Sequence, residues 1–153
     1  TDAAAAQAVD NKIGALPAVA ALTLADKPAV VAARADYDAL TAAQKALVTK
    51  EADLQAAEQK IADLQAQADV DAIAQGITSI TDPASGDTEL TLPTVPAGYT
   101  VAIKTSSDTN VIALNGDITA PAASTDVDLV LTVTHTASGK TADTGTIKVT
   151  VTP

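Results

Sequence analysis

The chain changes its amino-acid alphabet abruptly near Ala68, and this break constrains the fold more than any other feature. Alanine, leucine, glutamine, aspartate and lysine dominate residues 1–67, whereas threonine, valine, isoleucine, aspartate and glycine dominate residues 68–153. The first composition is typical of helices and the second of strands joined by tight turns. The sequence therefore predicts an α+β chain of two modules, a helical bundle over 1–67 and an antiparallel β-sandwich over 68–153.

Apolar residues in the first module recur at helical spacing. Val9, Ile13 and Leu16 share one face of a helix that we expect from Asp2 to Leu16, where Pro17 ends it. The stripe is narrow and the rest of the helix surface is alanine-rich or polar, so this helix needs partners to bury its apolar face.

Two capping boxes mark the starts of further helices in this module. Thr23 with Asp26 precedes a second helix that we expect to end near Leu40, and Thr41 with Gln44 begins a third. The third helix either runs as one rod or breaks briefly at Thr49. Three antiparallel helices then form the predicted bundle.

From Ile77 onward the apolar period changes from helical to two, as in half-buried strands. Every second residue of Val127–Val133 is aliphatic, and the dipeptides Asn115-Gly116 and Ser138-Gly139 suit tight turns. Short strands at this spacing favour a small antiparallel sandwich. We expect strands over Glu89–Leu92, Tyr99–Thr105, Asn110–Ala113, Asp117–Thr119, Val127–Thr136 and Thr144–Thr152.

The net charge of −10 divides as −3 over residues 1–67 and −7 over residues 68–153. Such an acidic field repels phosphate backbones and anionic headgroups, so we expect no nucleic-acid partner. The absence of cysteine excludes disulfides, thiolate zinc sites and cysteine nucleophiles.

The longest uncharged apolar stretch, Ile13–Ala25, contains Pro17 and is too short to cross a bilayer core of about 30 Å, so no membrane insertion is expected. The sequence starts at Thr1 without an initiator methionine or signal peptide. We therefore expect a piece of a longer, processed protein.

Few residues are candidates for catalysis. His135 is the single histidine and no Gly-x-Ser-x-Gly motif accompanies it, so a structural histidine at a strand end is the favoured interpretation. With Tyr37 and Tyr99 as the only aromatic residues, the chain lacks the platforms on which sugar rings stack. The sequence predicts no enzyme, no catalytic residues and no organic cofactor.

Calcium is the one cofactor for which the sequence offers ligands. Asp82, Asp87 and Glu89 form one acidic group and Asp126 with Asp128 a second, and hard cations bind clustered carboxylate oxygens. Neither group completes an EF-hand pattern. Solvated acidic loops are the alternative interpretation of the same residues.

Seven segments of residues 69–153 follow one another in a characteristic order: Leu90–Pro93, Tyr99–Lys104, Ser106–Asp108, Val111–Ile112, Asn115–Thr119 with Pro121, Leu129–Val133 and Gly145–Val151. In this order they resemble the bacterial Ig-like domains, in particular the short atrophied type of Gram-positive surface proteins and multimodular extracellular enzymes. The strand Val101–Lys104 lacks the tryptophan that this type often carries. Because such surface domains sometimes carry a lysine–asparagine amide, the resemblance also implies Lys104, Lys148, Asn110 and Asn115 as the partners to test for one.

Residues 35–48 are similar to the alanine-rich helical units of S-layer proteins and cell-wall adhesins. Both resemblances imply an extracellular, non-catalytic module at a Gram-positive cell surface, acting as a spacer, an assembly unit or an adhesive segment. Its partners would be other copies of the surface protein or a component of the cell wall or host surface. The alternative is an accessory module of an extracellular polysaccharide-degrading enzyme.

Overall fold

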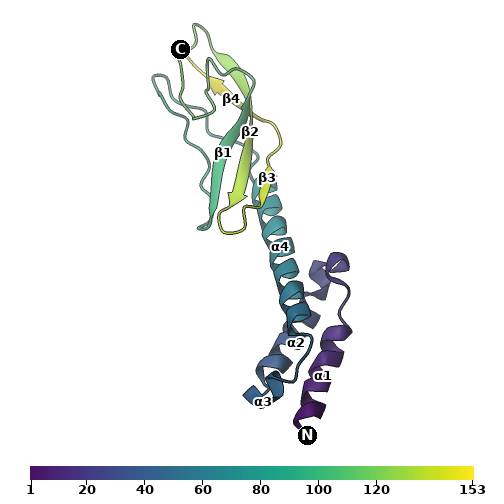
Figure 1. The fold of residues 1–153 in the computed structure, drawn as a ribbon. Helices are drawn as coiled ribbons and strands as arrows, with labels where there is room; N and C mark the ends of the chain where they lie inside the picture. The colour runs from purple at the N-terminus through teal and green to yellow at the C-terminus, as the bar shows by residue number, and fades with distance from the viewer. The chain divides into compact units, whose positions relative to one another are not determined.

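The structure is a computed structural model that describes all of residues 1–153 (Figure 1). The chain divides into two compact units, Thr1–Gln65 and Ala66–Pro153. The first unit is built of helices and the second carries a four-stranded antiparallel sheet, so the chain belongs to the α+β class. A membrane crossing needs a long and nearly uncharged apolar helix, and none of the helices meets that requirement.

The predicted third helix does not run as one rod. It is broken near Thr49, the second of the two alternatives. Residues 46–50 separate a single helical turn from a long helix, α4, whose residues up to Gln65 belong to the first unit and the rest to the second. The α-helices are α1 Asp2–Gly14, α2 Lys27–Asp38, α3 Ala42–Lys45 and α4 Glu51–Gly76, with 3₁₀ turns at Val19–Ala21 and Leu24–Asp26.

The first unit is held together by one aliphatic core that α1, α2 and α4 share. The predicted stripe of α1 is buried at Val9 and Ile13, whereas Leu16 lies beyond the helix end and is only partly buried. A bidentate ion pair from Arg34 of α2 to Glu58 of α4, with N–O distances of 2.6 and 2.7 Å, lies beside this core. The buried members are Val9, Ile13, Leu22, Val30, Ala33, Tyr37, Leu54, Ala57 and Ile61.

Both predicted capping boxes have short-range hydrogen bonds. The Gln44 amide donates to the Thr41 hydroxyl at 3.3 Å, and the Thr41 amide donates to the Gln44 side chain at 2.9 Å. At the other box the Asp26 carboxylate accepts from the amide and the hydroxyl of Thr23, and these bonds lower the pKa of Asp26. The helix starts that the sequence predicts are therefore fixed locally.

Asp10 of α1 accepts hydrogen bonds from the residues just before α4, at the position where the predicted third helix is broken. Its carboxylate, 6% exposed, accepts hydrogen bonds from the Thr49 amide at 3.0 Å, the Thr49 hydroxyl at 2.7 Å and the Lys50 amide at 2.9 Å. Burial alone would raise the pKa of Asp10, but these hydrogen bonds and the nearby Lys50 charge lower it. One carboxylate thus joins α1 to the start of α4.

Replacement of Asp10 by asparagine tests this junction. We expect Asp10→Asn to lower the free energy of unfolding of the helical unit by about 2 kcal/mol near neutral pH, because charge-assisted hydrogen bonds to backbone amides are lost. Urea unfolding followed by far-ultraviolet circular dichroism measures the difference. Asp53→Asn, at an exposed position of the first turn of α4, is the matched control.

The difference in free energy of unfolding between wild type and Asp10→Asn also depends on pH. Because the pKa of Asp10 is lower in the folded than in the unfolded chain, its contribution is complete above the unfolded value of about 4 and is lost as the pH falls through the folded value. The difference in free energy of unfolding between wild type and Asp10→Asn should therefore shrink as the pH falls below the unfolded pKa of Asp10. A difference that stays constant from neutral to acidic pH would contradict this role.

The sheet of the second unit is organised around its longest strand. β2 pairs antiparallel with β1 along one edge. Along its other edge, the first half of β2 pairs with β4 and the second half with β3, both antiparallel. β1 carries a bulge between Ile103 and Thr105. The strands are β1 Tyr99–Ser106, β2 Thr125–His135, β3 Thr141–Asp143 and β4 Ile147–Val151.

The strand predicted over Thr144–Thr152 is present as β4, and the short strand β3, which is not predicted from the sequence, precedes it, with the buried Thr144 after β3. The Leu131 amide donates to the Thr144 hydroxyl at 3.0 Å, and the Thr144 amide donates to the Leu131 carbonyl at 2.9 Å. β3 and β4 both pair with β2 and leave a break in the ladder between them. Thr144 lies in this break and continues the contact with β2.

One face of the sheet is buried and the other faces solvent. The aliphatic row of β2, residues 127, 129, 131 and 133, is fully buried, as the alternation predicts. Val127, Leu129 and Leu131 contact residues of the extended segments 77–92 and 111–118, whereas Val133 packs against Val70 and Ala74 of α4. The C-terminal part of α4 and these segments together cover the apolar face.

Three of the predicted short strands are reduced to single bridges. Glu89 pairs with Asp117 and Ile112 with Ile118, and neither pair extends into a ladder. Both predicted turns are confirmed, since Gly116 and Gly139 have φ values of 96° and 69°, where only glycine is unstrained.

Candidate interaction surfaces

The predicted acidic residues Asp126 and Asp128 lie on the solvent face of β2, opposite β4. Lys148 Nζ lies 2.9 Å from Asp126 Oδ2, and the Thr150 hydroxyl donates to Asp126 Oδ1 at 2.9 Å. These two contacts lower the pKa of Asp126, and the carboxylate in turn raises the pKa of Lys148. Lys148 is also the register partner of Asp128.

The other predicted acidic group is spread along an extended segment. Asp82 Oδ1 accepts the Thr150 amide at 2.7 Å, and Asp87 Oδ2 accepts the Ala84 amide at 2.8 Å. The backbone of Glu89 bridges Asp117. Thr150 thus contacts Asp82 and Asp126 together, a link between the two predicted groups that the sequence does not reveal.

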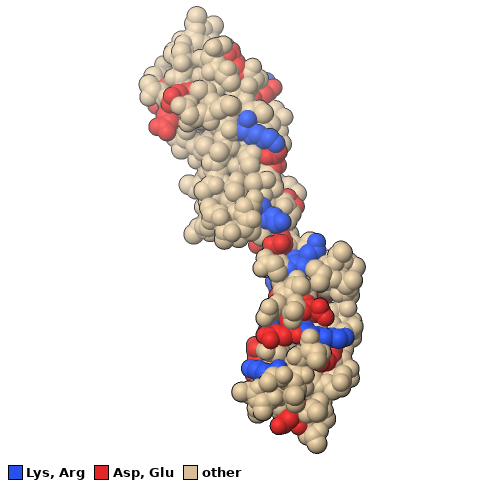
Figure 2. All heavy atoms as spheres, viewed as in Figure 1, with Lys and Arg blue, Asp and Glu red and all other residues tan.

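These acidic residues do not gather into a multidentate site. No three histidine or acidic side chains in the chain come close enough to hold a metal ion together. Figure 2 shows acidic side chains spread over the visible face with lysine and arginine among them, rather than collected in one patch. Calcium binding by Asp82, Asp87, Glu89, Asp126 and Asp128 stays a prediction.

A second ion pair lies on the same solvent face of the sheet. Lys104 of β1 pairs with Asp143 of β3, and the Thr132 hydroxyl of β2 donates to Asp143 Oδ1 at 2.7 Å. Lys104 and Thr132 lower the pKa of Asp143. Both lysines proposed for an amide with asparagine therefore contact aspartates instead, and the structure does not bring either lysine to Asn110 or Asn115.

His135 lies at the end of β2 in a polar turn. Its Nδ1 lies 2.7 Å from the Ser138 hydroxyl, and its ring centroid lies 4.9 Å from that of Tyr99. The Tyr99 hydroxyl lies 3.5 Å from Asp69 Oδ2, and burial followed by this carboxylate raises the pKa of Tyr99. This arrangement fits a histidine that closes the β2–β3 turn.

The outer edge of β1 carries no strand partner. The Thr136 amide donates to the Gly98 carbonyl at 2.9 Å, which fixes the alternation of hydrogen-bonded pairs between β1 and β2. Counting from this bonded pair, Thr100 and Ala102 point their amides and carbonyls toward β2. Val101 and Ile103 lie between them and therefore point their amides and carbonyls away from β2, at the outer edge. On β4 the corresponding outer amide of Thr150 already binds Asp82. β1 is therefore the more available edge of the sheet.

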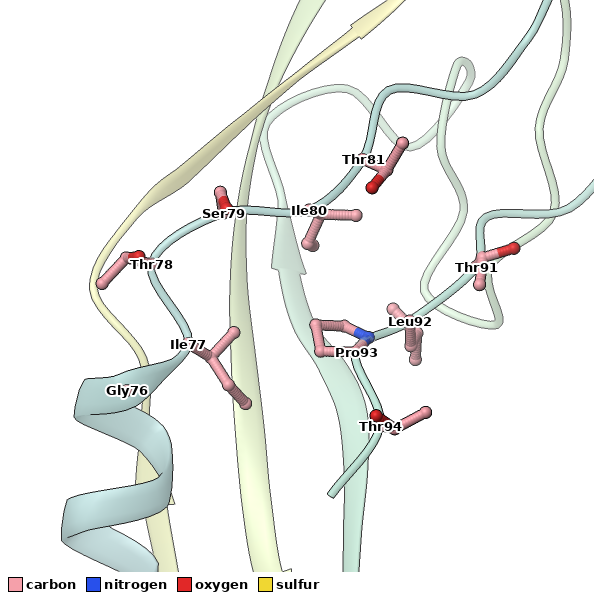
Figure 3. Close-up of a pocket in the computed structure, with 10 residues that line it drawn as sticks. All are labelled: Gly76, Ile77, Thr78, Ser79, Ile80, Thr81, Thr91, Leu92, Pro93 and Thr94. Carbon is pink, nitrogen blue, oxygen red and sulfur yellow. The ribbon is translucent and has the colours of Figure 1, made fainter.

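An open groove of about 420 Å³ lies between residues 76–81 and 91–94 (Figure 3). The side chains of Ile77, Ile80 and Pro93 project into the space between these two extended segments. Threonine and serine hydroxyls form the rim, and no charged side chain lines the groove. The sequence gives no signal for this groove, because the predicted strand Glu89–Leu92 includes only two of its lining residues and no element was predicted over residues 77–81.

No protein-family model and no curated protein matches the chain. The functional interpretation therefore depends on the residues and surfaces described above.

Calcium titration tests the acidic surface. Because Asp82 and Asp126 already accept protein hydrogen bonds, we expect calcium chloride to act only by screening the charge of −10, with a gradual shift in unfolding midpoint that magnesium chloride reproduces. Calorimetry and thermal unfolding measure this. Saturable binding near one equivalent that Asp126→Asn abolishes would contradict the expectation and establish the predicted site.

Proposed function

We propose that this chain is a non-catalytic structural module of a secreted bacterial surface protein, an S-layer or cell-wall protein, in which it acts as a spacer or assembly unit. The observation that carries the proposal is the unpartnered outer edge of β1, where Val101 and Ile103 direct backbone groups away from the sheet. Such an edge is a template for pairing with a strand of another chain.

The proposal includes a finer architecture for each unit. The first unit is a three-helix bundle of α1, α2 and α4, supported by their common aliphatic core. The second unit is an Ig-like sandwich of the atrophied type, in which residues 77–92 and 110–119 form a reduced second layer. The buried cluster between this layer and the sheet supports that assignment.

The contacts of the polar residues support a structural rather than a catalytic role. His135 contacts a turn serine, and Asp126 and Asp143 are occupied by lysines. Each of these groups has a local contact that contributes to the fold, so none needs a substrate to explain its position.

Pairing through β1 would be selective rather than indiscriminate. The bulge and the charge at Lys104 limit regular pairing to the part of β1 before that residue. A net charge of −10 on each copy opposes association at low ionic strength. We therefore place assembly at high local concentration, at raised salt or in the presence of divalent cations.

Static light scattering and small-angle scattering over a concentration series, with and without millimolar calcium, test the proposal. We expect the mass to grow with concentration, and more steeply when calcium or salt screens the charge. Lys104→Glu, at the β1 edge, should weaken association. Lys148→Glu is the matched control, since it also breaks a lysine–aspartate pair and changes the net charge by the same amount. At a salt concentration that screens this added charge, it should associate nearly as strongly as the wild type.

A constant monomer mass under all conditions would contradict the assembly role, and equal effects of the two variants would contradict the β1 edge. The alternative, an accessory module of an extracellular polysaccharide-degrading enzyme, predicts a monomer that binds purified cell-wall glycan.

A further inference from the structure

The groove of Figure 3 has two walls with unused backbone hydrogen-bonding capacity. Thr78–Thr81 on one side and Thr91–Thr94 on the other make no backbone hydrogen bond to another part of the chain. Pro93 has no amide, so the second wall offers the amides of its other residues and all of its carbonyls. Extended segments with unpaired backbone groups accept an added strand readily.

The side chains that line the groove suit an extended polypeptide. Ile80, 7% exposed, and the half-buried Ile77 and Leu92 provide an apolar floor. The rim consists of exposed hydroxyl side chains from both walls, such as Thr78 and Thr91. A strand places alternate side chains on opposite faces, so every second residue of an occupant would reach the floor and the others would face solvent.

Two acidic residues adjoin one end of the groove in the sequence. Thr81 and Thr91 mark the same end in Figure 3, and the chain carries Asp82 directly after the first and Glu89 two residues before the second. Glu89 is exposed, and residues 68–153 have a net charge of −7. An occupant with lysine or arginine at this end is therefore favoured over an acidic one, including an acidic segment of a second copy.

We propose that this groove binds an extended, basic-ended polypeptide segment of another protein by strand addition. The segment lies between the two walls, directs alternate aliphatic side chains onto Ile80 and Leu92, and places a lysine or arginine near Glu89. Four wall residues span about 13 Å, which sets the recognised core at four to five residues. This binding is independent of the β1 edge and of the proposed surface location.

A capped peptide of alternating valine and threonine with a lysine at each end is the probe, since it fits in either direction. We expect saturable binding to the full chain by fluorescence anisotropy. The same peptide with alternate backbone amides methylated should bind at least about tenfold more weakly, because it cannot complete the strand pairing. Replacing both lysines by glutamate should weaken binding roughly fivefold.

Two matched variants locate the peptide on the molecule. Thr91→Arg puts a bulky cation at the groove rim and should weaken binding by at least about tenfold, whereas Thr100→Arg, at an exposed position of β1, should not change it. Glu89→Gln should remove most of the preference for lysine over glutamate. The proposal is overturned by a lack of saturable binding at millimolar peptide, by equal binding of the methylated peptide, or by equal effects of the two arginine variants.

Discussion

The row of aliphatic side chains on β2 is the constraint on which the second unit depends. β2 is the strand that pairs with all three others, and its residues 127, 129, 131 and 133 are each fully buried. Burial of four such side chains contributes on the order of 10 kcal/mol, which is comparable with the net stability of a small domain. Because successive side chains of a strand point to opposite faces, the residues between these four lie on the other face of the sheet, which is exposed to solvent. The apolar face is then covered by α4 and the extended segments, and the polar face carries the ion pairs.

This one-sided burial also determines which surfaces are left for partners. On the polar face, Lys104 pairs with Asp143 and Lys148 with Asp126, so these four charged side chains already have partners within the unit. The remaining capacity for interaction lies in backbone groups, at the outer edge of β1 and along the walls of the groove. Both surfaces would recognise extended backbone, with charge deciding which sequences approach. These unpaired backbone segments are surfaces that the composition of the chain alone does not reveal.

The sequence predicts the features that depend on local chemistry. The helical stripe at Val9 and Ile13, the capping box of Thr41 with Gln44, the alternation of β2 and the glycine turns at Gly116 and Gly139 are all present. Each of them requires only residues within a few positions of one another.

Features that depend on distant partners could not be predicted. Asp10 caps residues that lie 39 and 40 positions later, and Thr150 joins Asp82 to Asp126 only because β4 pairs with β2. The short strands at Glu89 and Ile112 have the right side chains, but their partners supply only one bridge each. The groove likewise lies between segments 76–81 and 91–94, whose approach no local motif marks.

Residue-resolved hydrogen exchange on the dilute monomer tests the central claim most directly, namely that β2 is the paired centre of a sheet whose outer edge is open. The amides of Val127–Val133 should exchange slowest in the second unit, whereas those of Val101 and Ile103, and of Thr78–Thr81 beside the groove, should exchange close to the rate of unstructured chain. Protection of Val101 and Ile103 equal to that of β2 would mean that the β1 edge is already paired, and would contradict the account.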